Sequence, residues 1–225
     1  MKIPVSVWSD IACPWCFVGK AHLESAIQQL SVEEPAVQLQ ITWRAFELDP
    51  RPKEPSSLSY AERLATKYNR SVAQAQDMLD TMTNAIRDAG GHADFDTVIP
   101  ANTFDAHRLI QWAGDTDRSG ETSDAQHRIT DAFMRGYLGE GLNLAKHEEM
   151  LEVVAALKLD RTAAEEVLST QRYADVVRAD ELAAEQNNIR GVPFFVIGGY
   201  GLSGAQPSEA LIEVIRQAQG KGSQT

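Results

Sequence analysis

The chain contains 225 residues, of which 21 are basic and 32 are acidic, so its formal net charge at pH 7 is −11. This acidic balance argues against general nucleic-acid binding, which needs a basic surface, and against docking on anionic membranes. The length and the 43% share of hydrophobic residues are ordinary for one large domain or two small ones with a substantial core.

The first ten residues, MKIPVSVWSD, alternate in polarity and lack the apolar run and cleavage site of a signal peptide. No apolar run approaches transmembrane length. We therefore expect a cytoplasmic protein. In that compartment a chain with two cysteines, close in sequence, is not a disulfide-stapled scaffold, and catalysis, redox sensing or metal binding is favoured.

The chain opens with the pattern of a βαβ unit. Residues 2–8 alternate as a strand, a helix with Leu23, Ile27 and Leu30 on one face follows, and residues 37–43 alternate again. A strand, a helix and a second strand over about 45 residues predict parallel strands joined by a right-handed crossover.

A long helical region follows a boundary loop at residues 47–57, which contains three prolines. Between Leu58 and about Asn187 no strand pattern is convincing. Helices are expected at 59–68, 71–89, 103–113, 121–138, 147–157 and 161–187, the last broken once.

Strand patterns return near the end of the chain. The apolar residues 193–197, the pair Gly198-Gly199 and the segment 200–203 predict a hairpin, and Pro207 opens a final helix.

The order of these elements predicts an α/β domain interrupted by helices. We expect a discontinuous domain of residues 1–49 and 188–219, with 58–187 as a helical insertion and 220–225 as a tail. The last helix or helices of the insertion are expected to pack back on the α/β core.

The two cysteines fall between the first strand and the first helix, in the sequence Cys13-Pro14-Trp15-Cys16. Unpaired N–H groups and the macrodipole at a helix start favour a thiolate, so we expect a lowered pKa for Cys13, the more reactive sulfur. Cys16, one turn later, can resolve a mixed disulfide. Pro14 suits an early helical position, and Trp15 is expected to be partly exposed beside the sulfurs.

The CxxC motif has three possible interpretations. Structural zinc usually needs four ligands, and neither a second CxxC nor an HxxxH pattern supplies the other two, so metal is disfavoured. Inert buried thiols are disfavoured by the position between a strand and a helix. A redox pair is favoured, since a CxxC near a βαβ pattern is typical of thioredoxin-like proteins.

Gly191-Val192-Pro193 opens the late strand, where a proline removes a ladder hydrogen bond. A trans proline with a purely structural role is one interpretation. A cis peptide bond is the other, and it is favoured once the CxxC and the terminal hairpin and helix are considered together.

The segments SVWSDIACPWCFVGK, ANTFDAHRL and GVPFFVIGGYGLSGAQP together resemble the FrnE-like branch of the DsbA-type thioredoxin-fold proteins. This resemblance implies a thioredoxin-like fold with a large helical insertion and thiol–disulfide oxidoreductase or isomerase chemistry. It also implies Cys13 as nucleophile, Cys16 as resolving cysteine, and Val192 and Pro193 as a cis-proline element that binds substrate.

A related branch comprises 2-hydroxychromene-2-carboxylate isomerases and kappa-class glutathione transferases. Its members typically carry a serine where this chain has Cys13, and they lack the second cysteine. This difference counts against their activity here, although glutathione stays a candidate redox co-substrate.

Asp105 and His107 lie in a stretch similar to one that recurs in the family, and they are candidate pocket-lining residues. The alternative is a capped helix start, with Asn102 or Thr103 as N-cap. The spacing of His107, His127 and His147 does not match that of a metal-binding motif.

The leading hypothesis is therefore a thiol–disulfide oxidoreductase or isomerase with no metal and no tightly bound cofactor. Its expected partners are protein or small-molecule disulfides and thiols and a cellular dithiol or glutathione recycling system, without nucleic acid or membrane. A reducing cytosol favours reduction or isomerisation over net oxidation. The alternatives are a glutathione-dependent isomerase or transferase of aromatic small molecules and a non-enzymatic redox-sensing binding module.

Overall fold

The computed structural model describes residues 2–51, 58–119 and 124–222. Among these residues, no helix combines the length and apolar character needed to cross a membrane. The elements follow in the order β1 (Lys2–Ser9), α1 (Pro14–Glu33), β2 (Gln38–Ala45), α2 (Tyr60–Tyr68), α3 (Val72–Asp88), α4 (Phe104–Ser119), α5 (Ala125–Gly139), α6 (His147–Ala156), α7 (Arg161–Ser169), α8 (Ala174–Gln186), β3 (Phe194–Ile197), β4 (Tyr200–Ser203) and α9 (Ser208–Gly222).

The sheet has the strand order β2-β1-β3-β4. β1 pairs in parallel with β2 and antiparallel with β3, and β4 completes the hairpin with β3. Because β1 is central, its inward residues Ile3, Val5 and Val7 are almost fully buried. The parallel pair joined by α1 confirms the expected βαβ unit.

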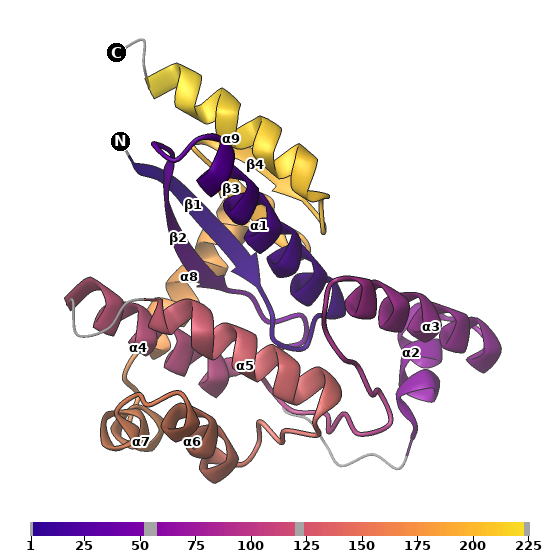
Figure 1. The fold of residues 1–225 in the computed structure, drawn as a ribbon. Helices are drawn as coiled ribbons and strands as arrows, with labels where there is room; N and C mark the ends of the chain where they lie inside the picture. The colour runs from indigo at the N-terminus through magenta and orange to yellow at the C-terminus, as the bar shows by residue number, and fades with distance from the viewer. Residues whose placement is uncertain (1, 52–57, 120–123, 223–225) are drawn as a thin grey trace.

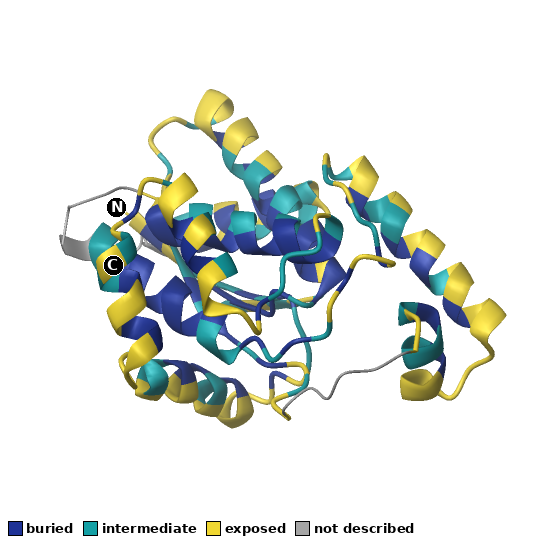
Figure 2. Cartoon of the chain, turned by 90° about the horizontal axis from the view of Figure 1, so that it is seen from below, coloured by how far each residue is buried: buried dark blue, intermediate teal, exposed yellow. Residues whose placement is uncertain are grey.

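Helices cover both faces of this sheet (Figure 1). α1 and α9 lie side by side over one face, and α8 lies on the other face beside β2. Figure 2 shows buried residues gathered between the sheet and these helices, whereas α2 and α3 carry mostly exposed and half-buried residues. The thioredoxin-like fold with helices inserted between β2 and β3 is therefore confirmed.

Two glutamine side chains attach the inserted helices to the outer edge of β2. Gln126 of α5 accepts a hydrogen bond from Trp43 N–H at 3.0 Å and donates from Nε2 to Trp43 O at 3.2 Å. Gln111 of α4 donates to the same carbonyl at 2.9 Å. These side chains satisfy backbone groups that an edge strand would otherwise leave unpaired.

α8 is attached to the sheet through Asp180, which is buried. The Asp180 carboxylate accepts hydrogen bonds from Ala45 N–H at 3.0 Å and Arg44 Nη1 at 2.8 Å, and its backbone carbonyl accepts from Trp8 Nε1 at 2.9 Å. Burial raises the pKa of Asp180 above its ordinary value, although these partners act to lower it. We propose that α8 belongs to the thioredoxin-like unit.

The ends of several elements differ from the sequence-based expectation. α9 extends to Gly222, into the expected tail 220–225, and residues 223–225 lie outside the described residues. The described part of α5 begins at Ala125, and 121–123 of the expected helix also lie outside. The break expected within 161–187 falls between α7 and α8.

Candidate active site

The CxxC segment turns from β1 into α1 at Cys13. Cys13 has extended backbone angles (φ −98°, ψ 110°) and occupies the N-cap, and Pro14 is the first helical residue. Cys13 N–H donates to Asp10 O at 3.1 Å, and Cys16 N–H donates to Cys13 O at 3.0 Å. Proline suits this place because the first helical N–H has no intrahelical partner.

The two thiols are free in this structure but differ in environment. Cys13 is 5% exposed and Cys16 is fully buried. Burial raises the pKa of Cys16 well above its ordinary value, and a hydrogen bond with Cys13 and the charge of Cys13 raise it further. Cys16 is therefore held as a neutral thiol beside Cys13, while Trp15 lies 40% exposed next to them.

The late proline meets the cysteines across the fold. The Val192-Pro193 peptide bond is cis, as the sequence predicted, and Val192 O lies 3.5 Å from Cys13 Sγ, which donates to it. α1 approaches Pro193 closely at Gly19, where an added Cβ would lie 2.8 Å from Pro193 Cγ. The structure thus brings Cys13, Cys16, Val192 and Pro193 together.

Asp10 organises the loop between β1 and α1, although it is not among the residues predicted to form the site. Its carboxylate is buried and accepts hydrogen bonds from Ala12 N–H at 3.2 Å and Leu48 N–H at 2.7 Å. Burial acts to raise the pKa of Asp10, but the interaction with His107 and the bond from Leu48 hold it below its ordinary value. A carboxylate directly after a buried strand was the available sequence signal.

His107 lies on α4 and reaches this loop from the inserted helices. It is 3% exposed, and its Nε2 is 3.6 Å from Asp10 Oδ1, a distance too long for a hydrogen bond. Within the described part of the chain, Nε2 has no hydrogen-bond partner. His107 therefore supports the loop that carries Cys13.

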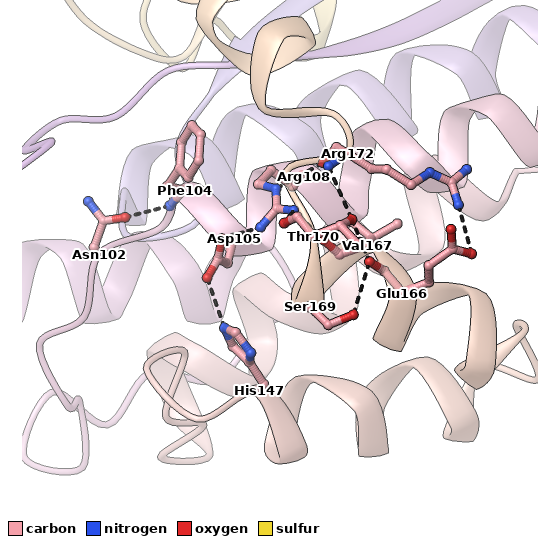
Figure 3. Close-up of polar contacts among 10 residues, drawn as sticks. All are labelled: Asn102, Phe104, Asp105, Arg108, His147, Glu166, Val167, Ser169, Thr170 and Arg172. Carbon is pink, nitrogen blue, oxygen red and sulfur yellow. Dashed lines mark hydrogen bonds and ion pairs between the residues drawn. The ribbon is translucent and has the colours of Figure 1, made fainter.

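Asp105 points elsewhere (Figure 3). Its carboxylate pairs with Arg108 at 2.7 Å and with His147 at 2.9 Å. Arg108 in turn donates to the carbonyls of Val167 and Thr170 at the end of α7. Asp105 thus contributes to packing among the inserted helices. Asn102 accepts from Phe104 N–H at 2.9 Å, in agreement with the alternative of a capped helix start.

A cavity of about 640 Å³ lies beside the cysteine loop. Asp105 and His107, expected as pocket-lining residues, are not among the residues that line it. Its walls come from the loop before Cys13, the segment after β2, α2, the segment before α4, and α5: Asp10, Ala12, Leu48, Asp49, Arg51, Leu58, Tyr60, Arg63, Leu64, Thr66, Lys67, Pro100, Ala101, Thr103 and Tyr137.

Tyr60 connects this cavity to the nucleophile. Burial raises the pKa of Tyr60 to about 12, and the charge of Cys13 contributes in the same direction. Tyr60 lines the cavity, and so does Ala12, the residue before Cys13. A molecule in the cavity would therefore lie next to the loop that carries Cys13. Across the ranges that the structure describes, no three His, Cys, Asp or Glu side chains form a candidate metal site.

A dithiol at the start of a helix, after a central strand and facing a cis-proline, defines a thioredoxin-like protein of the thiol–disulfide oxidoreductase type. Residues 4–216 match the DSBA-like thioredoxin domain, and the chain belongs to this family. The probable DsbA oxidoreductase of Streptomyces coelicolor is 35% identical, with a TM-score of 0.85 over 97% of this chain and 90% of that chain.

Other comparisons also cover nearly the whole chain. The Uncharacterized protein YwbO of Bacillus subtilis is 26% identical over 98% of this chain and all of its own. A 2-hydroxychromene-2-carboxylate isomerase has a TM-score of 0.65 at 16% identity, covering 99% of each chain. The cytosolic disulfide reductase DsbM of Pseudomonas aeruginosa, also solved with GSH, has a TM-score of 0.56 at 14% identity, covering 98% of this chain and 97% of its own.

Proposed function

We propose that this protein catalyses thiol–disulfide exchange with Cys13 as nucleophile and Cys16 as resolving cysteine. The observation that carries the proposal is the position of Cys13 at the N-cap of α1, with its sulfur 3.5 Å from the carbonyl of Val192 and adjacent to a buried, neutral Cys16. The family and the similar oxidoreductases support this class of reaction.

The reaction proceeds in two exchange steps. The Cys13 thiolate attacks one sulfur of a substrate disulfide, forming a mixed disulfide and releasing the other substrate sulfur as a thiolate. Cys16 then loses its proton and attacks Cys13 Sγ, which forms the Cys13–Cys16 disulfide and releases the second substrate thiolate. The substrate gains two electrons and, from solvent, two protons. In isomerisation, a substrate thiol attacks the mixed disulfide instead, with no net oxidation.

Backbone groups beside Cys13 provide a place for the substrate. The carbonyl of Val192 accepts a hydrogen bond from the thiol in the free protein, and in the complex it would accept one from the N–H of an extended substrate. Trp15, exposed beside the sulfurs, offers an apolar contact. Pro14, the first residue of α1, fixes the helix start between Cys13 and Trp15.

Regeneration of the dithiol requires an external thiol. We propose a cellular dithiol or glutathione for this step, since DsbM has been solved with GSH and shares the fold. A cytoplasmic location and reduction or isomerisation in vivo are consistent with the cytosolic assignment of DsbM. The exchange steps need neither a metal nor a tightly bound organic cofactor.

Single cysteine variants test the proposal. Cys13→Ser is expected to lower insulin-disulfide reduction and scrambled-ribonuclease reactivation at least about a hundredfold, because it removes the nucleophile. Cys16→Ser is expected to accumulate a mixed disulfide with the substrate, visible as a mass increase that dithiothreitol reverses. Circular dichroism checks that both variants fold. Undiminished turnover by Cys13→Ser would falsify the proposal.

The cavity beside Cys13 favours one second candidate, a glutathione-dependent isomerase or transferase of aromatic small molecules. Its volume of about 640 Å³ suits a small organic molecule, and the isomerase of this class has the same fold. Turnover of an aromatic substrate with glutathione that survives in Cys13→Ser/Cys16→Ser would support this candidate over thiol–disulfide exchange.

A further inference from the structure

The cavity lies next to the cysteine loop, but the two exchange steps do not use it. Asp10 and Ala12 form the wall nearest Cys13, whereas Arg63 and Lys67 of α2 form part of another wall. The cavity therefore extends from the loop just before Cys13 to a helix that belongs to the inserted segment rather than to the thioredoxin-like sheet.

Arg63 and Lys67 make this wall positive. They lie four residues apart on α2, so both project to the same side of the helix. Arg63 donates to Leu58 O at 3.3 Å and stacks over Tyr60, with 5.2 Å from Cζ to the ring centroid. Lys67 Nζ lies 5.7 Å from the ring of Tyr68. Within the described residues, neither cation forms an ion pair with a carboxylate.

The acidic residues of the cavity are already engaged. Asp49 forms an ion pair with Arg51 at 2.7 Å. Asp10 is buried and accepts the N–H groups of the cysteine loop and of Leu48. The charge of Arg63 opposes the burial that raises the pKa of Tyr60 and of Tyr137, so Arg63 acts on the interior of the cavity. Among the described residues, no carboxylate therefore neutralises the two cations of this wall.

The rest of the lining is largely apolar. It consists of the aliphatic side chains of Leu48, Leu58 and Leu64, the residues Pro100 and Ala101, and the rings of two tyrosines. A ligand that fits these walls has an apolar or peptide-like body and an anionic group directed toward α2. Its other end then lies beside Cys13.

We propose that this cavity binds the carboxylate of a low-molecular-weight thiol or disulfide and so presents the sulfur of that molecule to Cys13. This inference rests on the proposed exchange reaction and names its substrate class: small anionic disulfides. Arg63 and Lys67 bind the carboxylate, and the apolar lining holds the body of the ligand.

Paired model disulfides test the preference for an anion. The anionic dithiobis(nitrobenzoate) and the neutral dithiodipyridine are each mixed with pre-reduced protein in a single turnover, which needs no added reductant. The anionic-to-neutral ratio of second-order rate constants is expected to fall about tenfold in Arg63→Gln/Lys67→Gln, because charge-assisted bonds are lost. The matched control Arg70→Gln, an exposed arginine just after α2 that is outside the cavity, is expected to leave the ratio unchanged.

A binding measurement separates this proposal from the exchange reaction. S-hexylglutathione, an unreactive thioether with two carboxylates, is titrated into the wild-type protein and the double variant by calorimetry. Binding that weakens about tenfold in the double variant, and not in Arg70→Gln, supports the proposal. The cavity proposal is overturned if S-hexylglutathione does not bind the wild type, or if the rate ratio is the same in all three proteins. In either case, continued exchange with the neutral disulfide leaves the proposed exchange reaction intact. Failure of the wild type to react with either disulfide would instead contradict the exchange reaction itself.

Discussion

Cys13 and Cys16 lie one helical turn apart and have distinct chemical environments. Cys13 Sγ donates to the backbone carbonyl of Val192 at the start of α1, whereas Cys16 is fully buried. Ser9 and the Asp10 backbone supply hydrogen bonds that lower the pKa of Cys16, but burial and Cys13 outweigh them. A mixed disulfide at Cys13 has neither an S–H nor a charge, so it removes both contributions by which Cys13 raises the pKa of Cys16 and favours attack by Cys16.

The pH dependence of stability provides a test of the Cys16 environment. Because the folded-state pKa of Cys16 lies above its unfolded value, its contribution to stability is complete below about pH 8.5 and is lost as the pH rises. Above that pH, the unfolding free energy of the reduced wild type should fall more steeply than that of Cys16→Ala, by about 1.4 kcal/mol per pH unit. Urea unfolding under anaerobic conditions measures both slopes, and parallel profiles would contradict the assignment.

Asp10 and His107 illustrate what residue patterns do not reveal. Asp10 stands three residues before Cys13, but its role depends on Leu48 and His107, which approach from the segment after β2 and from α4 only in the folded chain. Asp105, two residues before His107, instead contacts His147 of α6 and Arg108 of its own helix. The direction of a side chain on a predicted helix depends on packing, which one sequence does not specify.

Helix α1 packs closely against Pro193 and β3 at Gly19. A Cβ at this position would lie 2.8 Å from Pro193 Cγ and 3.2 Å from Phe195 Cζ. The absence of a side chain thus permits the approach that brings Cys13 to Val192. Glycine in a helix interior lowers helix stability by roughly 1 kcal/mol relative to alanine. At Gly19 this loss accompanies the close contact with Pro193.

Gly19→Ala is therefore expected to destabilise the protein by about 1–3 kcal/mol despite its better helix propensity, since overpacking displaces Pro193. The rate of insulin-disulfide reduction should fall with it, because Cys13 and Val192 separate. Denaturant unfolding and initial rates measure the two effects. Gly220→Ala, in a part of α9 with open space around the added Cβ, is the matched control. A stabilised, fully active Gly19→Ala would contradict this account.

Most elements were predictable because their signals are local. Alternation identified β1 and β2, and helical periodicity identified the inserted helices within a few residues, except that α4 continues to Ser119 beyond its expected end at 113. The cysteine pair and Val192-Pro193 were also identified, since turn chemistry and family resemblance mark them. The cavity was not, because its lining comes from five separate segments whose proximity is a tertiary property.

The backbone of Trp43 joins α4 and α5 to the sheet, and Asp180 joins α8 to it. The backbone of Trp43 is bound by Gln111 and Gln126, and Asp180 binds the next residues of β2. These contacts are buried or partly buried and link segments that are far apart in sequence. We therefore expect the sheet and the inserted helices to unfold together.

Gln126→Ala tests this coupling. The substitution leaves the N–H of Trp43 without its partner and removes one of two donors to its carbonyl, so it should cost about 2–4 kcal/mol of unfolding free energy. Gln76→Ala, on an exposed face of α3, serves as control. Tryptophan fluorescence and circular dichroism should give coincident transitions in urea. Separate transitions in the wild type, or a cost below about 0.5 kcal/mol for Gln126→Ala, would refute the coupling.

The contact between Cys13 and Val192 has a consequence for protein synthesis. The two residues are 179 positions apart, so the nucleophile leaves the ribosome long before the carbonyl that faces it. At about 5–20 residues per second, the interval is roughly 9 to 36 seconds. During that time β1 lacks its neighbour β3, and the thiols are without the enclosure of the finished fold. The nascent chain thus exposes an unprotected dithiol to cellular oxidants and electrophiles on every round of translation.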